Sequence, residues 1–369
     1  MKKILAITST RADYGILSNI LKKINDSKKL NLLLVVTGTH LCEEYGLTIN
    51  EIERDQLPVA VKIPIIIPNS SKTRVPKEMA ELSVRLSQII ADKKPDFMLI
   101  LGDRYEMLSA ASTALVMHLP IIHISGGETT EGAIDNQIRN AISQMAEYHF
   151  PGAVEYAEKL ISMGAEPSKV FNVGDPALEN IKNLEYLSRA RLETELEIKI
   201  NKNSLLVTYH SVTQELESLE SQINSLVSAL ISHNGNKIIT YPNSDEGSDI
   251  IIKALKEYSS KYSKVKLVKN LGKQRYLSLM KYCGAVVGNS SSGIIEAPFM
   301  KKPVVNIGNR QKGRLMSKNI ISCGYSQKEI ESAIAQSLSP EFQKIAENCK
   351  SLYGEGNTSK EIVSVLESL

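Results

Sequence analysis

The chain has 369 residues, more than one hydrophobic core usually supports, so two domains are expected. Hydrophobic residues make up 42% and charged residues 23%, which predicts a globular protein, and a net charge of +3 argues against a broad basic surface for nucleic acid. No apolar run approaches the roughly 18 residues of a membrane-spanning helix, so no membrane segment is expected. The 4 cysteines show no CxxC spacing and no histidine partner at metal-binding spacing, which favours reduced thiols in the cytoplasm and argues against a zinc site.

The first half of the chain begins with a continuous apolar strand, residues 3–8. A loop over residues 9–15 and a periodic helix over 16–24 follow, and residues 30–37 form a second strand. Continuous rather than alternating hydrophobicity, with helices between the strands, predicts a parallel sheet covered on both faces. Ligands of such sheets bind at the carboxyl ends of the strands. Arg11 lies at one of these ends, where its guanidinium either binds phosphate oxygens or stays a solvated charge.

Two later strands each end shortly before a carboxylate. The strand at residues 97–101 precedes Asp103, and the strand at residues 120–124 precedes Glu128. Because the carboxyl ends of parallel strands meet at one edge, we expect both acids to face the same ligand, which neighbouring glycines allow to approach closely. The alternative for Asp103 is that it caps the helix that follows.

A further acid and an arginine lie on one predicted helix. Asp135 and Arg139 are four residues apart, so they share a helix face and can form an ion pair with each other. Alternatively, Arg139 holds a carboxylate near Glu128 in a fixed position. The sequence from Gly174 to Pro176 then predicts the end of the first domain.

The second half repeats the order of strand, turn and helix, which predicts a second doubly wound domain. After a connecting helix over residues 177–196, strands are expected at residues 204–209, 237–240, 265–268, 284–287 and 304–307. His210 is the histidine at a strand end with hydroxyl neighbours, and it is the one for which we expect a function. For the other histidines packing is the expected role: His40, His118, His123, His149 and His233.

The segment GNSSSGIIEAP, residues 288–298, lies at a strand-to-helix turn. Unpaired N–H groups at the helix start and three serine hydroxyls predict a phosphate or diphosphate site, unless the serines only cap the helix. Glu296, one turn into the helix, is suited to accept hydrogen bonds from two ribose hydroxyls. Arg310, in the basic loop after the strand at 304–307, either joins this site as part of a diphosphate clamp or is solvated.

The motifs STRADYG, VTGTHL, LGDRYE, HISGGE, IDNQIRNAI and GNSSSGIIEAP follow one another along nearly the whole chain. In this order the chain resembles the hydrolysing UDP-N-acetylglucosamine 2-epimerases of bacterial sialic-acid biosynthesis, in the UDP-sugar 2-epimerase family. RADYG, in place of the RPE of the non-hydrolysing relatives, favours the hydrolysing branch. One departure is Ser211, where the family usually has a proline after the histidine.

The resemblance implies an α/β fold of the glycosyltransferase-B type, with two doubly wound Rossmann-like domains that face each other across a cleft. We expect the domains to cover residues 1–173 and 174–353, with a C-terminal helix, 354–369, that packs back onto the first. The resemblance also implies a homo-oligomer, a dimer or tetramer, formed through the N-terminal domain, and the cysteine usage indicates a cytoplasmic location. Neither a cofactor nor a metal is expected, and the partners are a UDP-sugar and UDP.

Site residues follow from the same resemblance. The positions implicated in catalysis are Asp103, Glu128, Asp135, Arg139 and His210. The positions implicated in binding the substrate or UDP are Arg11, Arg104, Asn243, Tyr276, Ser290, Ser291, Ser292, Glu296 and Arg310.

The implied reaction converts UDP-N-acetylglucosamine and water to N-acetylmannosamine and UDP, for sialic-acid synthesis. UDP is eliminated to leave a glycal, and water then adds with the opposite configuration at carbon 2. Asp103 is the expected base, and Glu128 with Asp135 is expected to act in the hydration. The alternatives are the same chemistry on UDP-2,4-diacetamido-2,4,6-trideoxyglucose, a glycosyltransferase of the same fold, and a nucleotide-sugar sensor without turnover.

Overall fold

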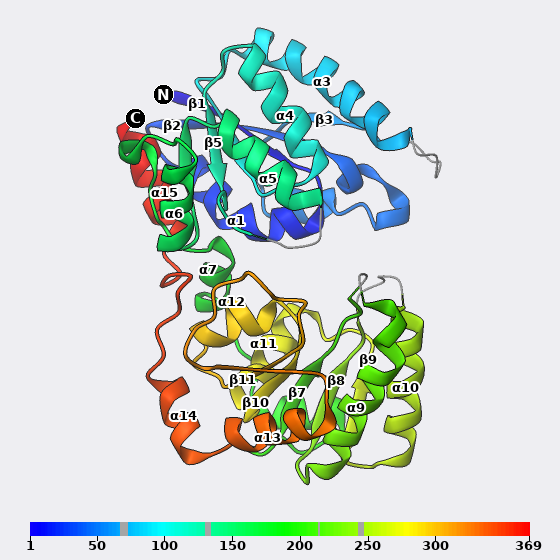
Figure 1. Ribbon diagram of the computed structural model, residues 1–369. Helices are drawn as coiled ribbons and strands as arrows, with labels where there is room; N and C mark the ends of the chain where they lie inside the picture. Colours follow the sequence, from blue (N-terminus) through cyan, green and yellow to red (C-terminus); the bar gives the residue numbers. More distant parts are fainter. Residues whose placement is uncertain (67–72, 130–133, 213–214, 243–246) are drawn as a thin grey trace. The chain divides into compact units, whose positions relative to one another are not determined.

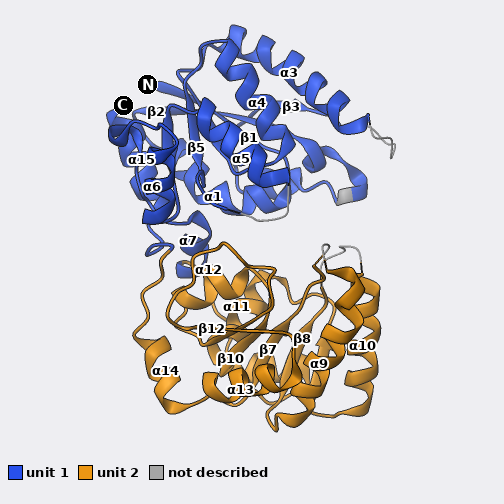
Figure 2. Ribbon diagram, viewed as in Figure 1, with its two compact units in different colours: residues 1–182, 353–369 blue, residues 183–352 orange. Residues whose placement is uncertain are grey.

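The computed structural model describes residues 1–66, 73–129, 134–212, 215–242 and 247–369. The chain forms two compact units, Met1–Lys182 with Tyr353–Leu369 (unit 1) and Asn183–Leu352 (unit 2) (Figure 2). Each unit is built on its own parallel sheet with helices along it (Figure 1).

Unit 1 contains a six-stranded parallel sheet in the order β3-β2-β1-β4-β5-β6. Its strands are β1 (Lys2–Thr8), β2 (Leu30–Thr37), β3 (Val59–Ile63), β4 (Phe97–Leu101), β5 (Ile121–Ile124) and β6 (Tyr148–Phe150). Its α-helices are α1 (Arg11–Asp26), α2 (Ile49–Arg54), α3 (Arg74–Lys93), α4 (Tyr105–Val116), α5 (Ile134–Met145), α6 (Val154–Ser162), α7 (Pro176–Lys182) and α15 (Thr358–Ser368).

The core of unit 1 has one layer on each face of its sheet. Along β1, successive apolar side chains point to opposite faces, as the pleat of a strand requires. Ile4 is in the same buried cluster as Ile20 of α1, and Leu5 is in another cluster with Leu86 of α3. The C-terminal helix α15 packs against α1 and α7, so the end of the chain belongs to unit 1, and the change of unit falls after Lys182 rather than at Gly174.

Helix α1 begins at Arg11, so the expected loop over residues 9–15 is wrong beyond its first two residues. Thr10 is the N-cap, and a capping box joins its side chain and backbone to Asp13. The first turn of this helix carries polar residues, so its start shows no hydrophobic periodicity, and the helix is recognised there by its cap alone.

Unit 2 contains a second six-stranded parallel sheet, in the order β12-β11-β10-β7-β8-β9. Its strands are β7 (Leu205–Thr208), β8 (Lys237–Thr240), β9 (Val265–Val268), β10 (Ala285–Gly288), β11 (Val304–Ile307) and β12 (Ile320–Cys323). Its α-helices are α8 (Arg189–Leu196), α9 (Leu219–Ser232), α10 (Ser248–Lys261), α11 (Gly272–Tyr282), α12 (Ser292–Phe299), α13 (Gln327–Ser337) and α14 (Pro340–Glu347).

The single connecting helix expected over residues 177–196 is wrong, because α7 ends at Lys182 and α8 begins at Arg189. Ser188 starts the second helix as its N-cap, with its side chain accepting a hydrogen bond from the Arg191 N–H at 3.3 Å.

Both sheets reverse their strand order at one point, between β1 and β4 in unit 1 and between β7 and β10 in unit 2. In open α/β sheets, ligands bind outside the carboxyl ends of the strands at this reversal. The prediction of two doubly wound α/β domains is confirmed, and the topology directs attention to the residues that follow these four strands.

Candidate functional site

An arginine in unit 1 holds two carboxylates. The guanidinium of Arg139, on α5, contacts Glu128 through Nη1 at 3.2 Å and Asp103 through Nη2. The three side chains are largely buried, with exposed fractions of 8% for Arg139, 20% for Asp103 and 11% for Glu128. Since Asp103 follows β4 and Glu128 follows its neighbour β5, the sheet brings both acids to one edge, and the arginine offsets the repulsion between them.

Two roles considered for these residues are not seen: helix capping by Asp103 and an ion pair between Asp135 and Arg139. Helix α4 has Arg104 as its N-cap and no side-chain capping bond, so Asp103 does not cap it. The ion pairs among the described residues join Arg139 to Asp103 and Glu128 and not to Asp135, so the local pair along α5 does not form. Arg139 instead ties the carboxyl ends of β4 and β5 to α5.

Asp135 lies one turn before Arg139 at the start of α5, and its side chain is exposed. Partial burial, and then the charge of Asp103, raise the pKa of Asp135, although Arg139 and Arg104 act in the opposite direction. A carboxyl group with a raised pKa is suited to donate a proton.

The loop after β1 is fixed by a buried network that sequence reasoning missed. The Asp13 carboxylate accepts hydrogen bonds from the Thr8 hydroxyl at 2.5 Å and from the Ser9 N–H at 2.9 Å. His40 joins this network through Nε2, 3.0 Å from the Thr8 Oγ1, and through Nδ1, 2.8 Å from the Thr48 Oγ1. Burial by itself would raise the pKa of Asp13, but the hydrogen bonds from His40, Thr8 and the backbone outweigh it and lower that pKa.

Two predicted phosphate-binding arginines of unit 1 are held by glutamates. Arg11, at the start of α1, is 72% exposed and pairs with Glu51, with its Nε 2.9 Å from the Oε1. Arg104 forms a bidentate pair with Glu106, which is fully buried, at 3.0 and 3.1 Å. Both guanidinium groups keep solvent-accessible surface at the carboxyl ends of β1 and β4, the strands at which the sheet order reverses.

Three serines, Ser290–Ser292, form a turn at the start of α12, which we call the serine turn. Ser291 is the N-cap of this helix, but its side chain makes no capping hydrogen bond, so the alternative of a simple serine cap is not seen for it. The Ser292 hydroxyl donates to the Glu296 carboxylate one turn later. Burial raises the pKa of Glu296, opposed by Ser292 and Lys273, and burial also raises the pKa of Tyr276, whose hydroxyl lies near Ser292 and Thr208.

Asn289 joins the other predicted residues of unit 2, and sequence reasoning missed it. This fully buried side chain exchanges two hydrogen bonds with the backbone of His210, at 2.7 and 2.9 Å. The backbone carbonyl oxygen of Asn289 accepts hydrogen bonds from the Arg310 side chain at 3.1 Å and from the Gln311 side chain at 2.9 Å. His210 after β7, the serine turn after β10 and the loop after β11 therefore form one connected group. Asn289 lies directly after the buried strand β10, but this place in the sequence does not identify its partner.

Asn243, a predicted UDP-binding residue, lies outside the described residues. Among the residues that are described, no group of three or more His, Cys, Asp or Glu side chains could hold a metal ion. The helices within the same ranges include none with the length and apolar character needed to cross a membrane.

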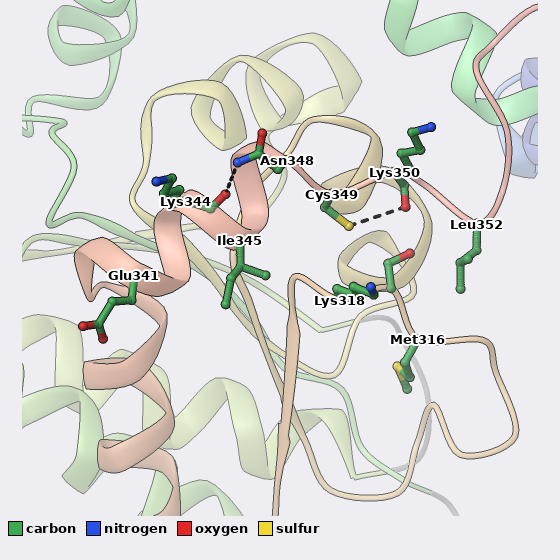
Figure 3. Close-up of a pocket in the computed structure, with 10 residues that line it drawn as sticks. Met316, Lys318, Glu341, Lys344, Ile345, Asn348, Cys349, Lys350 and Leu352 are labelled. Atoms are coloured by element: carbon green, nitrogen blue, oxygen red, sulfur yellow. Dashed lines mark hydrogen bonds between the residues drawn. The ribbon is translucent and has the colours of Figure 1, made fainter.

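An open cavity of about 890 Å³ in unit 2 lies elsewhere, around α14 (Figure 3). Lys318, Ile345 and Cys349 are among its lining residues, and none of the lining residues is a predicted site residue. The candidate site therefore rests on the side chains that follow the strands, not on this cavity.

Comparison with known proteins adds an independent finding. The family model described as UDP-N-acetylglucosamine 2-epimerase matches residues 22–367. A GDP/UDP-N,N'-diacetylbacillosamine 2-epimerase (hydrolyzing) of Campylobacter jejuni is 43% identical over 345 residues, 93% of this chain and 89% of that protein. A UDP-N,N'-diacetylbacillosamine 2-epimerase (hydrolyzing) of Legionella pneumophila is 33% identical, over 100% of this chain and 96% of that protein.

The fold has a match among solved structures. The crystal structure of UDP-GlcNAc 2-epimerase from Neisseria meningitidis bound to UDP-GlcNAc superposes with a TM-score of 0.83, at 18% identity and with 100% of both chains covered. This likeness confirms the predicted two-domain fold of the glycosyltransferase-B type.

Proposed function

Because the chain belongs to the UDP-N-acetylglucosamine 2-epimerase family, we propose that it is a hydrolysing 2-epimerase of a UDP-linked 2-acetamido sugar. The observation that carries this proposal is the group of Asp103, Glu128 and Arg139, with Asp135 beside it. Epimerisation at carbon 2 needs one group to remove a proton and another to return one on the opposite face, and this group offers several carboxylates.

The first step is an elimination. Carbon 2 of the sugar is not next to a carbonyl carbon, so its hydrogen becomes acidic only as the bond from carbon 1 to the diphosphate stretches. Asp103 takes this proton, the electrons of the C–H bond form the double bond between carbons 1 and 2, and UDP leaves with the bonding pair of the C–O bond. Arg139 keeps Asp103 in place and lowers the repulsion from Glu128.

The second step hydrates the resulting glycal. Water adds its hydroxyl group to carbon 1, and a proton is added to carbon 2 on the face opposite to the one from which it was lost. The raised pKa of Asp135 supports its role as the proton donor, and Glu128 is the group that we assign to accept the proton of the water. The net reaction consumes one water and releases UDP and a free sugar with inverted carbon 2.

The groups of unit 2 suit the leaving UDP. Serine hydroxyls and N–H groups at the start of α12, together with Arg310, can bind diphosphate oxygens. His210 is held by Asn289 next to this turn and is suited to donate a hydrogen bond to the same diphosphate. Glu296 can accept hydrogen bonds from the ribose hydroxyls.

For the sugar, we favour UDP-2,4-diacetamido-2,4,6-trideoxyglucose, which is UDP-N,N'-diacetylbacillosamine, over UDP-N-acetylglucosamine. The names of the Campylobacter and Legionella relatives support this choice, which reverses the order expected from motifs alone. The product would then be 2,4-diacetamido-2,4,6-trideoxymannose. A homo-oligomer and a cytoplasmic location stay predictions.

The test is to incubate the purified protein with each nucleotide sugar in deuterium oxide and to identify the released sugar by NMR. We expect free manno-configured sugar with deuterium at carbon 2, faster from the diacetamido substrate. Faster release from UDP-N-acetylglucosamine would reverse the choice of substrate. UDP release only in the presence of an acceptor would indicate a glycosyltransferase, and UDP binding with no release would indicate a sensor.

A further inference from the structure

His123 is a fully buried histidine of β5 for which packing was the expected role. Its ring nitrogens both make polar contacts: Nε2 lies 2.8 Å from the Gly102 carbonyl oxygen, and Nδ1 lies 3.2 Å from the Ser143 hydroxyl. A carbonyl oxygen can only accept, so Nε2 carries the proton and Nδ1 accepts from Ser143. Burial lowers the pKa of His123 to about 3, so the ring stays neutral and keeps this arrangement at physiological pH.

The two partners of His123 are next to the ends of the arginine–carboxylate group. Gly102 immediately precedes Asp103, and Ser143 lies one helical turn after Arg139 on α5. The histidine belongs to β5, whose carboxyl end leads to Glu128. One imidazole therefore joins the three segments that supply Asp103, Glu128 and Arg139.

The surroundings leave little room for another arrangement. A Cβ atom at Gly126 would lie 2.9 Å from the His123 Nδ1 and 3.0 Å from the Ser143 Oγ, so the chain after β5 passes directly over the ring. Gly102 has a positive φ of 76°, a conformation that favours glycine and turns the chain toward Asp103.

We propose that His123 is a positioning residue of the proposed epimerase. Through its hydrogen bonds to Gly102 and Ser143 it holds Asp103 in place against Arg139. It touches no substrate, and it acts through the residues that it holds. This inference rests on the proposed function for its kinetic test but not for its structural one. A displacement of about 1 Å at a reacting group lowers turnover by about 100-fold, so a loss of register is measurable.

The kinetic test compares three variants of His123. His123→Gln can keep both a donor for Gly102 and an acceptor for Ser143, so its kcat should stay within about tenfold of the unaltered enzyme. His123→Asn is too short to reach Gly102, and His123→Leu has no polar atom, so kcat should fall by about 100-fold in each, with the UDP dissociation constant unchanged. Equal kcat values for the Gln and Leu variants would overturn the proposal.

The matched control is His149, the neighbour of His123 across the sheet, which is also buried. Its Nδ1 has no hydrogen-bond partner among the described residues. His149→Leu should lower the melting temperature as His123→Leu does but leave kcat within about threefold. A loss of kcat in both leucine variants in proportion to their loss of stability would mean that His123 only fills the core.

A crystal structure of His123→Leu separates this inference from the proposed function. If the unaltered protein turns over neither nucleotide sugar, the proposed function fails, but the structure still decides the role of His123. Separation of the Asp103 and Arg139 side chains supports the positioning role. An unchanged contact between Asp103 and Arg139 overturns the positioning role. The same holds if the Gly102 carbonyl oxygen stays in place and finds another hydrogen-bond donor.

Discussion

Arg139 is a buried cation between two carboxylates, so its removal leaves two negative charges facing each other in a site that water reaches poorly. Arg139→Met keeps an unbranched apolar side chain but removes the guanidinium group and its charge. We expect the free energy of unfolding to fall by about 3 kcal/mol, because breaking a buried ion pair on one side leaves the partners uncompensated. Turnover should be lost as well. Urea denaturation followed by circular dichroism measures the first effect.

The matched control is Arg85→Met on α3, where the arginine pairs with Glu81 at the surface and the side chains are 53% and 44% exposed. Such a pair contributes less than about 1 kcal/mol, so this variant should unfold near the midpoint of the unaltered protein. If both methionine variants lost the same free energy of unfolding, Arg139 would not hold the two acids together.

A pH dependence follows from Asp13, whose pKa is lowered in the folded protein. A lowered pKa stabilises the fold at any pH above the usual value of 3.8 and ceases to do so as the pH falls through the folded pKa. Asp13→Asn should therefore cost about 2 kcal/mol at pH 7, and the gap to the unaltered protein should narrow below pH 3.8. Denaturation at about pH 7, 5 and 3, values on both sides of the ordinary carboxyl pKa, measures the difference in free energy of unfolding between the two proteins.

Asp26→Asn, at the exposed end of the same helix, is the control for Asp13 and should leave stability nearly unchanged at each pH. If the difference in free energy of unfolding between Asp13→Asn and the unaltered protein stayed constant down to the lowest pH, the shape of the Asp13 side chain, and not its charge, would stabilise the fold.

At the scale of elements, most strands were predictable, but β3, β6, β12 and the starts of polar helices were not. The continuous apolar runs place β4, β8, β9 and β11 at their observed bounds, because buried parallel strands need apolar side chains on both faces. The start of α1 escaped prediction because its first turn is polar and a capping box, not hydrophobic burial, stabilises it. The break between α7 and α8 escaped because the apolar spacing continues across it.

The approach of β10 to β7 depends on Gly288. A Cβ atom there would lie 1.9 Å from the Thr208 carbonyl oxygen, and the φ of +135° is one that side chains rarely adopt. Gly288→Ala should lower the free energy of unfolding by about 3 kcal/mol and weaken UDP binding, because Asn289 and then the serine turn follow it directly. Thermal unfolding and UDP titration calorimetry measure the two effects.

Gly15→Ala provides the contrast, since nothing lies within 4 Å of the added Cβ in α1. That variant should be more stable by about 0.5 to 1 kcal/mol, as expected for alanine in a helix interior. A Gly288→Ala protein with normal stability and normal UDP affinity would show that the turn tolerates a shift of β10.

At the scale of the whole molecule, the sequence predicted residues that gather at the strand ends of each unit but missed the residues that hold them together. Asp103, Glu128 and Arg139 were predictable because each follows or lies on an identifiable element. Asn289 was not, because it acts through a hydrogen bond to His210, 79 positions away in sequence. A local pattern carries no information about such a partner, so buried polar networks appear only when the strands are assembled.

The two units carry different tasks in the proposed reaction, so binding and turnover should be separable by mutation. Asp103→Asn in unit 1 should lower turnover by about 1000-fold, because an amide cannot take the proton from carbon 2, while the UDP dissociation constant stays within about threefold. Glu296→Gln in unit 2 should raise that constant by about tenfold, the loss of one charge-assisted hydrogen bond, since an amide accepts ribose hydroxyls less well than a carboxylate.

Titration calorimetry with UDP and a coupled assay of UDP release, run on the same preparations, give both numbers for each variant. At saturating nucleotide sugar, Glu296→Gln should recover most of its turnover, because its defect lies in binding, whereas Asp103→Asn should not recover at any concentration. Loss of UDP affinity in Asp103→Asn would show that the two tasks are not divided between the units in this way, and would shift the assignment of the base to another carboxylate. Failure of Glu296→Gln to recover its turnover would also contradict this division.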